Sequence, residues 1–209
     1  DGSVDLRISM EKAEEFPLVL RIPGWTDNPE VRINGRKINA DIDGGAWLQL
    51  NRSWDDGDRV QVEFPMSIEV KTWEQNKNAV SVYRGPLTYS LKIQERWERY
   101  GGTDKWPAYQ VFPGSPWNYG LVIDPENPEK NLKMVKQARK LADQPFTVEN
   151  APIEIQAQAK RLPDWGQENN GLIEKIPQSP VQSMEMTEKV VLIPMGAALL
   201  RVSAFPRVR

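Results

Sequence analysis

The chain has 209 residues, with 27 basic and 29 acidic side chains and a formal net charge of −2. This balance supplies no positive surface for nucleic acid or an anionic membrane, and no apolar run approaches the roughly 20 residues of a membrane-spanning helix. The sequence has no cysteine and no histidine, which excludes disulfides, thiolate nucleophiles, zinc–thiolate sites and any catalysis that needs an imidazole. We therefore expect no cofactor.

The first ninety residues alternate apolar and polar side chains in short runs. An apolar residue at every second position gives a strand one buried face. Turn residues recur every 8–12 residues, as is typical of a β-sandwich. We expect residues 4–10 and 16–22 to pair as a hairpin. Further strands are expected at residues 30–33, 36–38, 46–50, 60–64 and 68–72.

Two pairs of residues are interpreted as structural turns. Asn34 and Gly35 stand between two short alternating runs, and both tolerate the positive φ that a tight type I′ hairpin turn requires. Gly85 and Pro86 separate residues 80–83 from residues 87–91, and proline cannot donate to a strand ladder. We expect the chain to turn sharply at both places.

The alternating pattern weakens between residues 94 and 150 and returns towards the C-terminus. Residues 132–142 fit either a helix, by composition, or a strand, by alternation. Further strands are expected at residues 121–123, 153–159, 181–186, 190–193 and 198–205.

The predicted fold class is all-β, an antiparallel and jelly-roll-like β-sandwich with a second β-domain inserted before the final strands. Residues 1–91 and 188–209 are expected to form the first sandwich. Residues 92–187 are expected to form the inserted domain, with long loops.

Neither of two carboxylate patterns predicts a site. Asp55-Asp56-Gly57-Asp58 begins like a calcium loop but lacks the downstream bidentate glutamate, so a polar turn is the favoured interpretation. Loop carboxylates such as Asp124 and Glu126 could supply a pair for glycoside hydrolysis, but their spacing is that of solvated loop charges. We assign no catalytic residue and no metal ligand.

The eight tryptophans are the most suggestive feature of the composition. Sugar rings stack their C–H faces on aromatic rings, although core packing explains most tryptophans in proteins. Trp25 and Trp54 follow strand ends and are expected to cover a core. The candidates for carbohydrate contact stand in irregular segments: Trp73, Trp97, Trp106, Trp117 and Trp165.

Several segments in order resemble the C-terminal region of glycoside hydrolase family 127, the β-L-arabinofuranosidase-like family. These segments are residues 16–25 (FPLVLRIPGW), 31–35 (VRING), 51–54 (NRSW) with Gly57-Asp58, 64–66 (FPM), 82–89 (VYRGPLTY), 192–196 (LIPMG) and Leu200-Arg201. The match covers most of the chain, with residues 94–150 covered poorly.

The resemblance implies that catalysis belongs to an N-terminal α/α barrel with a zinc-bound cysteine and a nearby glutamate. No position here matches that motif, so this chain is expected to be a non-catalytic accessory β-region whose partner is the barrel of the same protein. A periplasmic or secreted location is implied on the same ground. Two alternatives remain open: a carbohydrate-binding module that uses exposed tryptophans, and a module that forms a homodimer.

Overall fold

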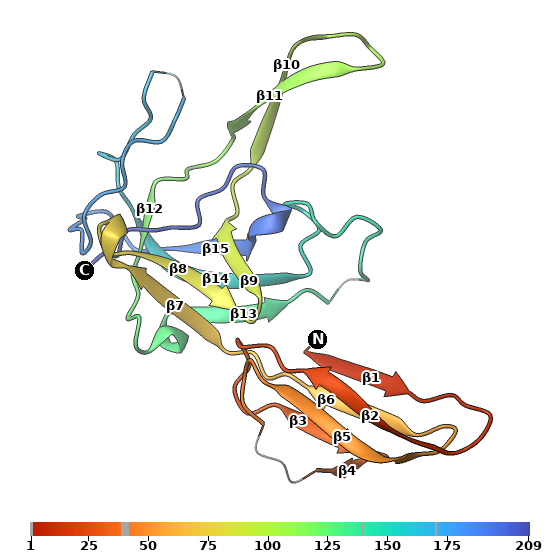
Figure 1. Cartoon of the computed structure of the whole chain (residues 1–209). Helices are drawn as coiled ribbons and strands as arrows, with labels where there is room; N and C mark the ends of the chain where they lie inside the picture. The colour runs from red at the N-terminus through yellow and green to blue at the C-terminus, as the bar shows by residue number, and fades with distance from the viewer. Residues whose placement is uncertain (1, 39–41, 139, 170) are drawn as a thin grey trace. The chain divides into compact units, whose positions relative to one another are not determined.

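The structure is a computed structural model that describes residues 2–38, 42–138, 140–169 and 171–209. Nearly all of its regular structure is antiparallel strand, and its helical elements are the short 3₁₀ turns η1 (Glu74–Asn76), η2 (Pro128–Lys130) and η3 (Met195–Ala197). The all-β fold class is confirmed. The chain divides into two compact units, Asp1–Ser67 and Ile68–Arg209 (Figure 1).

The first unit contains two antiparallel sheets. Its strands are β1 (Ser3–Arg7), β2 (Glu14–Arg21), β3 (Glu30–Ile33), β4 (Arg36–Lys37), β5 (Trp47–Trp54) and β6 (Arg59–Glu63). One sheet has the order β1-β6-β3-β4 and the other pairs β2 with β5. The expected hairpin between residues 4–10 and 16–22 is therefore wrong. Alternation fixes which face of a strand is buried, but it does not fix the neighbouring strand.

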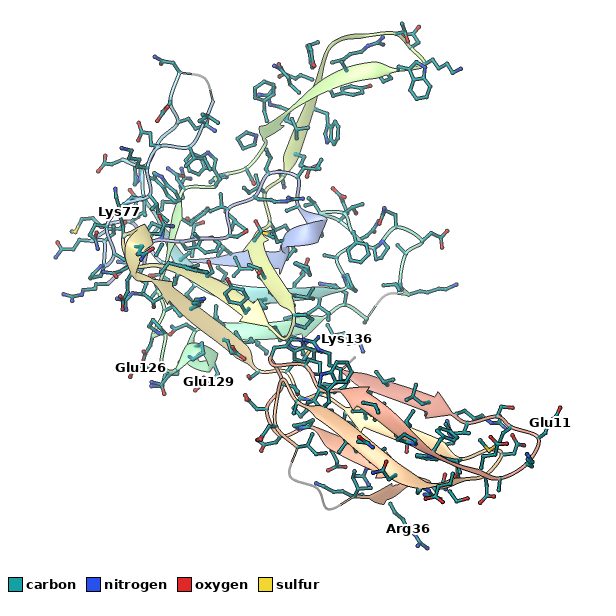
Figure 2. All side chains as sticks on the ribbon, viewed as in Figure 1. Glu11, Arg36, Lys77, Glu126, Glu129 and Lys136 are labelled. Carbon is teal, nitrogen blue, oxygen red and sulfur yellow. The ribbon has the colours of Figure 1, made fainter. Side chains whose placement is uncertain are left out.

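The apolar faces of these two sheets share one core. Trp54 is fully buried there with Val31, Val60 and Val62, and Leu18 of β2 packs against them. The Trp54 indole N–H donates to the carbonyl oxygen of Phe16 at 3.0 Å. Burial of one such large side chain contributes roughly 1.5–3 kcal/mol. Charged side chains such as Glu11 and Arg36 lie on the outside (Figure 2).

The turn at Asn34 and Gly35 is tied to a second turn by side-chain hydrogen bonds. The φ angles of Asn34 and Gly35 are 50° and 78°, and Ile33 pairs with Arg36 across the turn. Asn34 Nδ2 donates to Asp58 Oδ1 at 2.7 Å, and the Asp55 N–H donates to Asp58 Oδ2 at 3.1 Å. The Asp55–Asp58 segment thus forms a hydrogen-bonded polar turn.

The second unit is built on a seven-stranded sheet. Its strands are β7 (Ile68–Trp73), β8 (Ala79–Arg84), β9 (Leu87–Leu91), β12 (Tyr119–Leu121), β13 (Leu132–Lys136), β14 (Ile153–Arg161) and β15 (Glu188–Pro194). The order is β12-β14-β15-β9-β8-β7, and β13 also pairs with β14. Residues 132–136 therefore form a strand, the second of the two interpretations.

The unit boundary differs from the predicted domain boundaries. Strand β9 pairs with β15 through Leu91 and Leu192, and β15 pairs in turn with β14. Strands from residues 68–91 and from residues 92–187 thus belong to one sheet. The division falls after Ser67 rather than after residue 91, because the first unit closes its own core before β7 begins.

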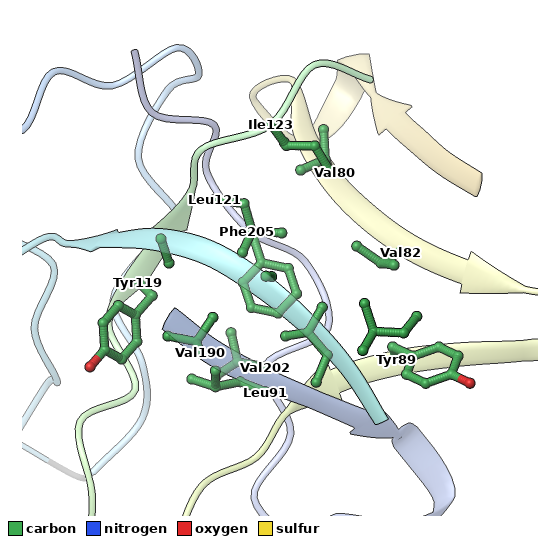
Figure 3. Close-up of a cluster of buried hydrophobic side chains, with 14 of the residues drawn as sticks. Val80, Val82, Tyr89, Leu91, Tyr119, Leu121, Ile123, Val190, Val202 and Phe205 are labelled. Atoms are coloured by element: carbon green, nitrogen blue, oxygen red, sulfur yellow. The ribbon is translucent and has the colours of Figure 1, made fainter. Parts of the chain in front are cut away.

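The C-terminal segment packs into the second unit without forming the strand expected at residues 198–205. Phe205 instead makes an isolated bridge to Val80, with both backbone hydrogen bonds at 2.8 Å. Figure 3 shows Phe205 among the buried side chains from the surrounding strands, with Leu121 and Val202 nearby. The strand expected at residues 181–186 is also wrong, since only Val181 bridges there, to Val208. Both segments are irregular chain: residues 198–205 bury Ala198, Val202 and Phe205, whereas Met184 and Met186 are exposed.

A hairpin that sequence patterning missed projects from the second unit (Figure 1). Its strands are β10 (Glu95–Gly102) and β11 (Pro107–Pro113). Among the described strands they pair only with each other, and a bulge lies between Arg99 and Gly101. Glu126 and Glu129, elsewhere in this unit, point away from its body (Figure 2).

Candidate functional site

Two of the five tryptophan candidates are exposed, and neither packs against another described aromatic ring. Trp73 ends β7, where the Lys71 ammonium lies 4.1 Å from its ring centroid and its indole N–H donates to Ser81 Oγ. Trp106 stands in the turn of the β10–β11 hairpin and is 74% exposed. A lysine ammonium over the Trp73 ring occupies one of the faces on which a sugar could stack.

Two further candidates belong to the packed interior. Trp117 and Trp165 meet edge to face with ring centroids 5.3 Å apart. Trp165 is only 4% exposed, and its indole N–H donates to the Glu174 carbonyl oxygen at 3.0 Å. Core packing therefore accounts for this pair, and the structure does not gather the five rings into one strip.

Trp97 lines a cleft together with polar groups and is itself exposed. This cleft, called the Trp97 cleft below, has a volume of about 330 Å³. The residues that line it include Glu95, Trp97, Phe146, Val148, Leu199 and Arg201. The first two come from β10, and the others come from irregular segments before β14 and after β15. Sequence patterning gave no sign that these segments meet.

Hydrogen bonds hold the Trp97 cleft together. The Glu95 carboxylate accepts the Trp97 indole N–H at 3.2 Å and the Leu199 backbone N–H at 3.4 Å. Arg201 Nε donates to the Ala198 carbonyl oxygen at 2.8 Å. One carboxylate thus links the hairpin to the segment that follows β15.

Two carboxylates with lowered pKa values, Asp58 and Asp124, serve turns. The Asn34 amide and the Asp55 N–H bind the Asp58 carboxylate and hold its pKa below its usual value. The Asn127 amide and the Glu126 N–H lower the pKa of Asp124 in the same way. Hydrogen bonds to a charged carboxylate favour that charged form.

The described part of the chain contains no group of three or more acidic side chains arranged to hold a metal ion. Across residues 2–38, 42–138, 140–169 and 171–209, no helix has the length and apolar character needed to cross a membrane.

Comparison with known proteins gives a family match to the first unit. Residues 1–66 match the family model described as the β-L-arabinofuranosidase GH127 middle domain. The match ends one residue before the structural boundary at Ser67. It therefore describes the first unit as a middle domain, whereas the sequence resemblance pointed to a C-terminal region. No curated protein sequence matches the chain at a significant level.

Solved structures resemble the chain over nearly its whole length. A GH127 β-L-arabinofuranosidase from Geobacillus stearothermophilus T6 is 26% identical, with a TM-score of 0.59, over 100% of this chain and 28% of its own length. A protein described as a glycoside hydrolase is 21% identical, with a TM-score of 0.62, over 100% of this chain and 30% of its own. A GH127 β-arabinofuranosidase is 20% identical, with a TM-score of 0.58, over 99% of this chain and 30% of its own.

The chain thus spans less than a third of the length of these relatives. The similarity is therefore to one part of each of these longer proteins.

Proposed function

We propose that this chain is a non-catalytic β-region of a GH127-type glycoside hydrolase that acts on β-L-arabinofuranosides. In this proposal both units support a separate catalytic barrel of the same protein. The observation that carries it is the family match to residues 1–66 together with structural similarity over the whole chain to part of an arabinofuranosidase.

The residue inventory supports the assignment of catalysis to another part of the protein. The chain offers no cysteine to act as a nucleophile and no histidine to move a proton. Its carboxylates Asp58 and Asp124 accept hydrogen bonds within their turns, from the Asp55 N–H and the Asn127 amide. A carboxylate that accepts amide hydrogen bonds within a turn is stabilised in its charged form, which suits a structural role better than general acid catalysis.

Hydrolysis of a chromogenic β-L-arabinofuranoside tests the proposal. We expect no turnover above background with the isolated chain. We expect turnover when the chain is produced together with the polypeptide encoded upstream of it in the same reading frame. The proposal fails if the isolated chain hydrolyses the substrate, or if that reading frame encodes no barrel with a cysteine nucleophile.

A further inference from the structure

The Trp97 cleft combines an aromatic ring face with hydrogen-bonding groups over a packed floor. We propose that it binds a neutral oligosaccharide. This inference goes beyond the accessory role proposed above, because it rests on the contacts of the cleft and assigns a ligand to the second unit. The volume of the Trp97 cleft, about 330 Å³, lies at the lower end of the roughly 300–1,000 Å³ typical of small-molecule sites. A short stretch of sugar rings suits that size.

The Trp97 ring is exposed and also fixed in orientation. It is 53% exposed, yet Tyr109 packs against it edge to face with ring centroids 5.8 Å apart. Both side chains lie on the same face of the hairpin, since Trp97 pairs with Val111 and Arg99 pairs with Tyr109. The Glu95 carboxylate holds the indole N–H. A ring ordered before binding loses little conformational entropy when a sugar stacks on it.

Charged groups on the rim complement the hydroxyl groups of a sugar. The Nε hydrogen bond of Arg201 to Ala198 anchors the guanidinium, and its terminal nitrogens are further donors. The Glu95 carboxylate is an acceptor beside the ring. Sugar hydroxyls donate and accept, so they suit a rim that carries both kinds of group. A carboxylate so close to the stacking ring disfavours acidic sugars, and we therefore specify a neutral one.

Part of the cleft lining is buried and well packed. Val148 and Ala198 line the cleft and are buried in a small apolar cluster with Ile193 and Ala197. Phe146 and Leu199 also line the cleft and are 65% and 56% exposed. Exposed apolar side chains of this kind also suit a protein partner. The fixed indole and the charged rim favour the sugar, and docking of a protein is an outcome of the test below.

The test is binding of defined trisaccharides to the full 209-residue chain. The probes are arabinotriose, xylotriose and cellotriose, with trigalacturonate as the acidic comparison, measured by saturation-transfer NMR and calorimetry. We expect saturable binding of at least one neutral trisaccharide. Trp97→Ala should weaken it about tenfold or more, as loss of an aromatic anchor does. Trp97→Phe should weaken it less, because a ring remains.

Trp106→Ala is the matched control, since it removes an exposed ring of the same hairpin that does not line the cleft. It should leave the affinity unchanged, and far-UV circular dichroism should show that each variant folds. The inference fails if no neutral trisaccharide binds, if only trigalacturonate binds, or if Trp97→Ala and Trp106→Ala weaken binding equally. Self-association that Trp97→Ala abolishes, without sugar binding, would assign the cleft to protein docking instead. These outcomes leave the hydrolysis test of the accessory role unaffected.

Discussion

The hydroxyl of Tyr89 is buried without a hydrogen-bond partner among the described residues. Burial also raises the pKa of this phenol. An unsatisfied buried polar group carries its full desolvation cost, so its removal should not weaken the fold. We expect Tyr89→Phe to leave the free energy of unfolding unchanged or to raise it by up to about 1 kcal/mol, measured by urea denaturation.

Ser90 provides the contrasting substitution in the same strand. Its hydroxyl is buried and donates to the Val202 carbonyl oxygen at 3.1 Å. Ser90→Ala should therefore cost about 0.5–1.5 kcal/mol, the net value of a typical hydrogen bond. A loss from Tyr89→Phe as large as that from Ser90→Ala would show that the phenol has a partner after all.

Asp58 should make the first unit sensitive to acid. Its carboxylate is buried, and hydrogen bonds from the Asn34 amide and the Asp55 N–H lower its pKa, with Arg52 3.4 Å away. A lowered pKa in the folded state gives stability that is present above the unfolded value of about 3.9. That stability is lost as the pH falls through the folded value.

We expect Asp58→Asn to lower the melting temperature of the first unit at pH 7. The difference from the parent chain should shrink below about pH 4, where the parent carboxylate also becomes neutral. Circular dichroism melts between pH 2 and 7 would measure this. Glu11→Gln, in the exposed turn after β1, should leave the melting temperature close to that of the parent chain at pH 7. If the difference in melting temperature between Asp58→Asn and the parent chain stays the same at low pH, the charge of Asp58 is not its cause.

At the scale of elements, Gly120 fixes how closely β12 approaches the C-terminal segment. The Leu121 N–H donates to the Pro206 carbonyl oxygen at 2.8 Å. A Cβ atom on Gly120 would lie 2.3 Å from Val208 Cγ2 and 3.3 Å from that carbonyl oxygen. Val208 is buried and branched, so it cannot move aside cheaply.

We expect Gly120→Ala to destabilise the second unit by about 1–3 kcal/mol, the usual cost of overpacking. Gly101→Ala is the matched control, because a Cβ there meets no atom within 4 Å. Its effect should stay within about 0.5 kcal/mol. Equal losses from both variants, measured by urea denaturation, would show that the close approach at Gly120 is not the cause.

The sequence predicts strands well where one face is buried, and poorly elsewhere. Alternation located β2, β6 and β14 because water lies on one face and core on the other. The β10–β11 hairpin was missed because it projects from the sheet and its strands carry almost no buried residue. The false strand at residues 198–205 has the opposite cause, since its buried residues pack as irregular chain.

Alternation of apolar and polar residues does not indicate which strands pair or which segments meet in the folded chain. The pairing of β1 with β6 joins residues more than fifty positions apart. Nothing in the sequence of either strand indicates which strand it pairs with. The same holds for the Trp97 cleft. Residue type singled out Trp97. Phe146 lies in a segment without periodicity, Leu199 lies in a segment wrongly predicted as a strand, and both meet Trp97 only through the tertiary fold.

At the scale of the whole molecule, each unit has its own hydrophobic core. The core around Trp54 is made of residues before position 67. The core around Phe205 is made of residues from Ile68 onwards. Cooperative unfolding follows shared buried surface, and local stability in a protein usually varies by such contiguous units. Damage to one core should therefore remain within its unit.

We expect Trp54→Ala, which costs about 3–5 kcal/mol, to remove hydrogen-exchange protection from β2, β5 and β6 of the full chain. A unit of about 67 residues is marginally stable, so a loss of that size unfolds it. Protection in β8, β14 and β15 should persist. Phe205→Ala should give the reverse pattern, because Phe205 is fully buried in the second core. Loss of protection in both units from either substitution would show that the chain unfolds as one cooperative body.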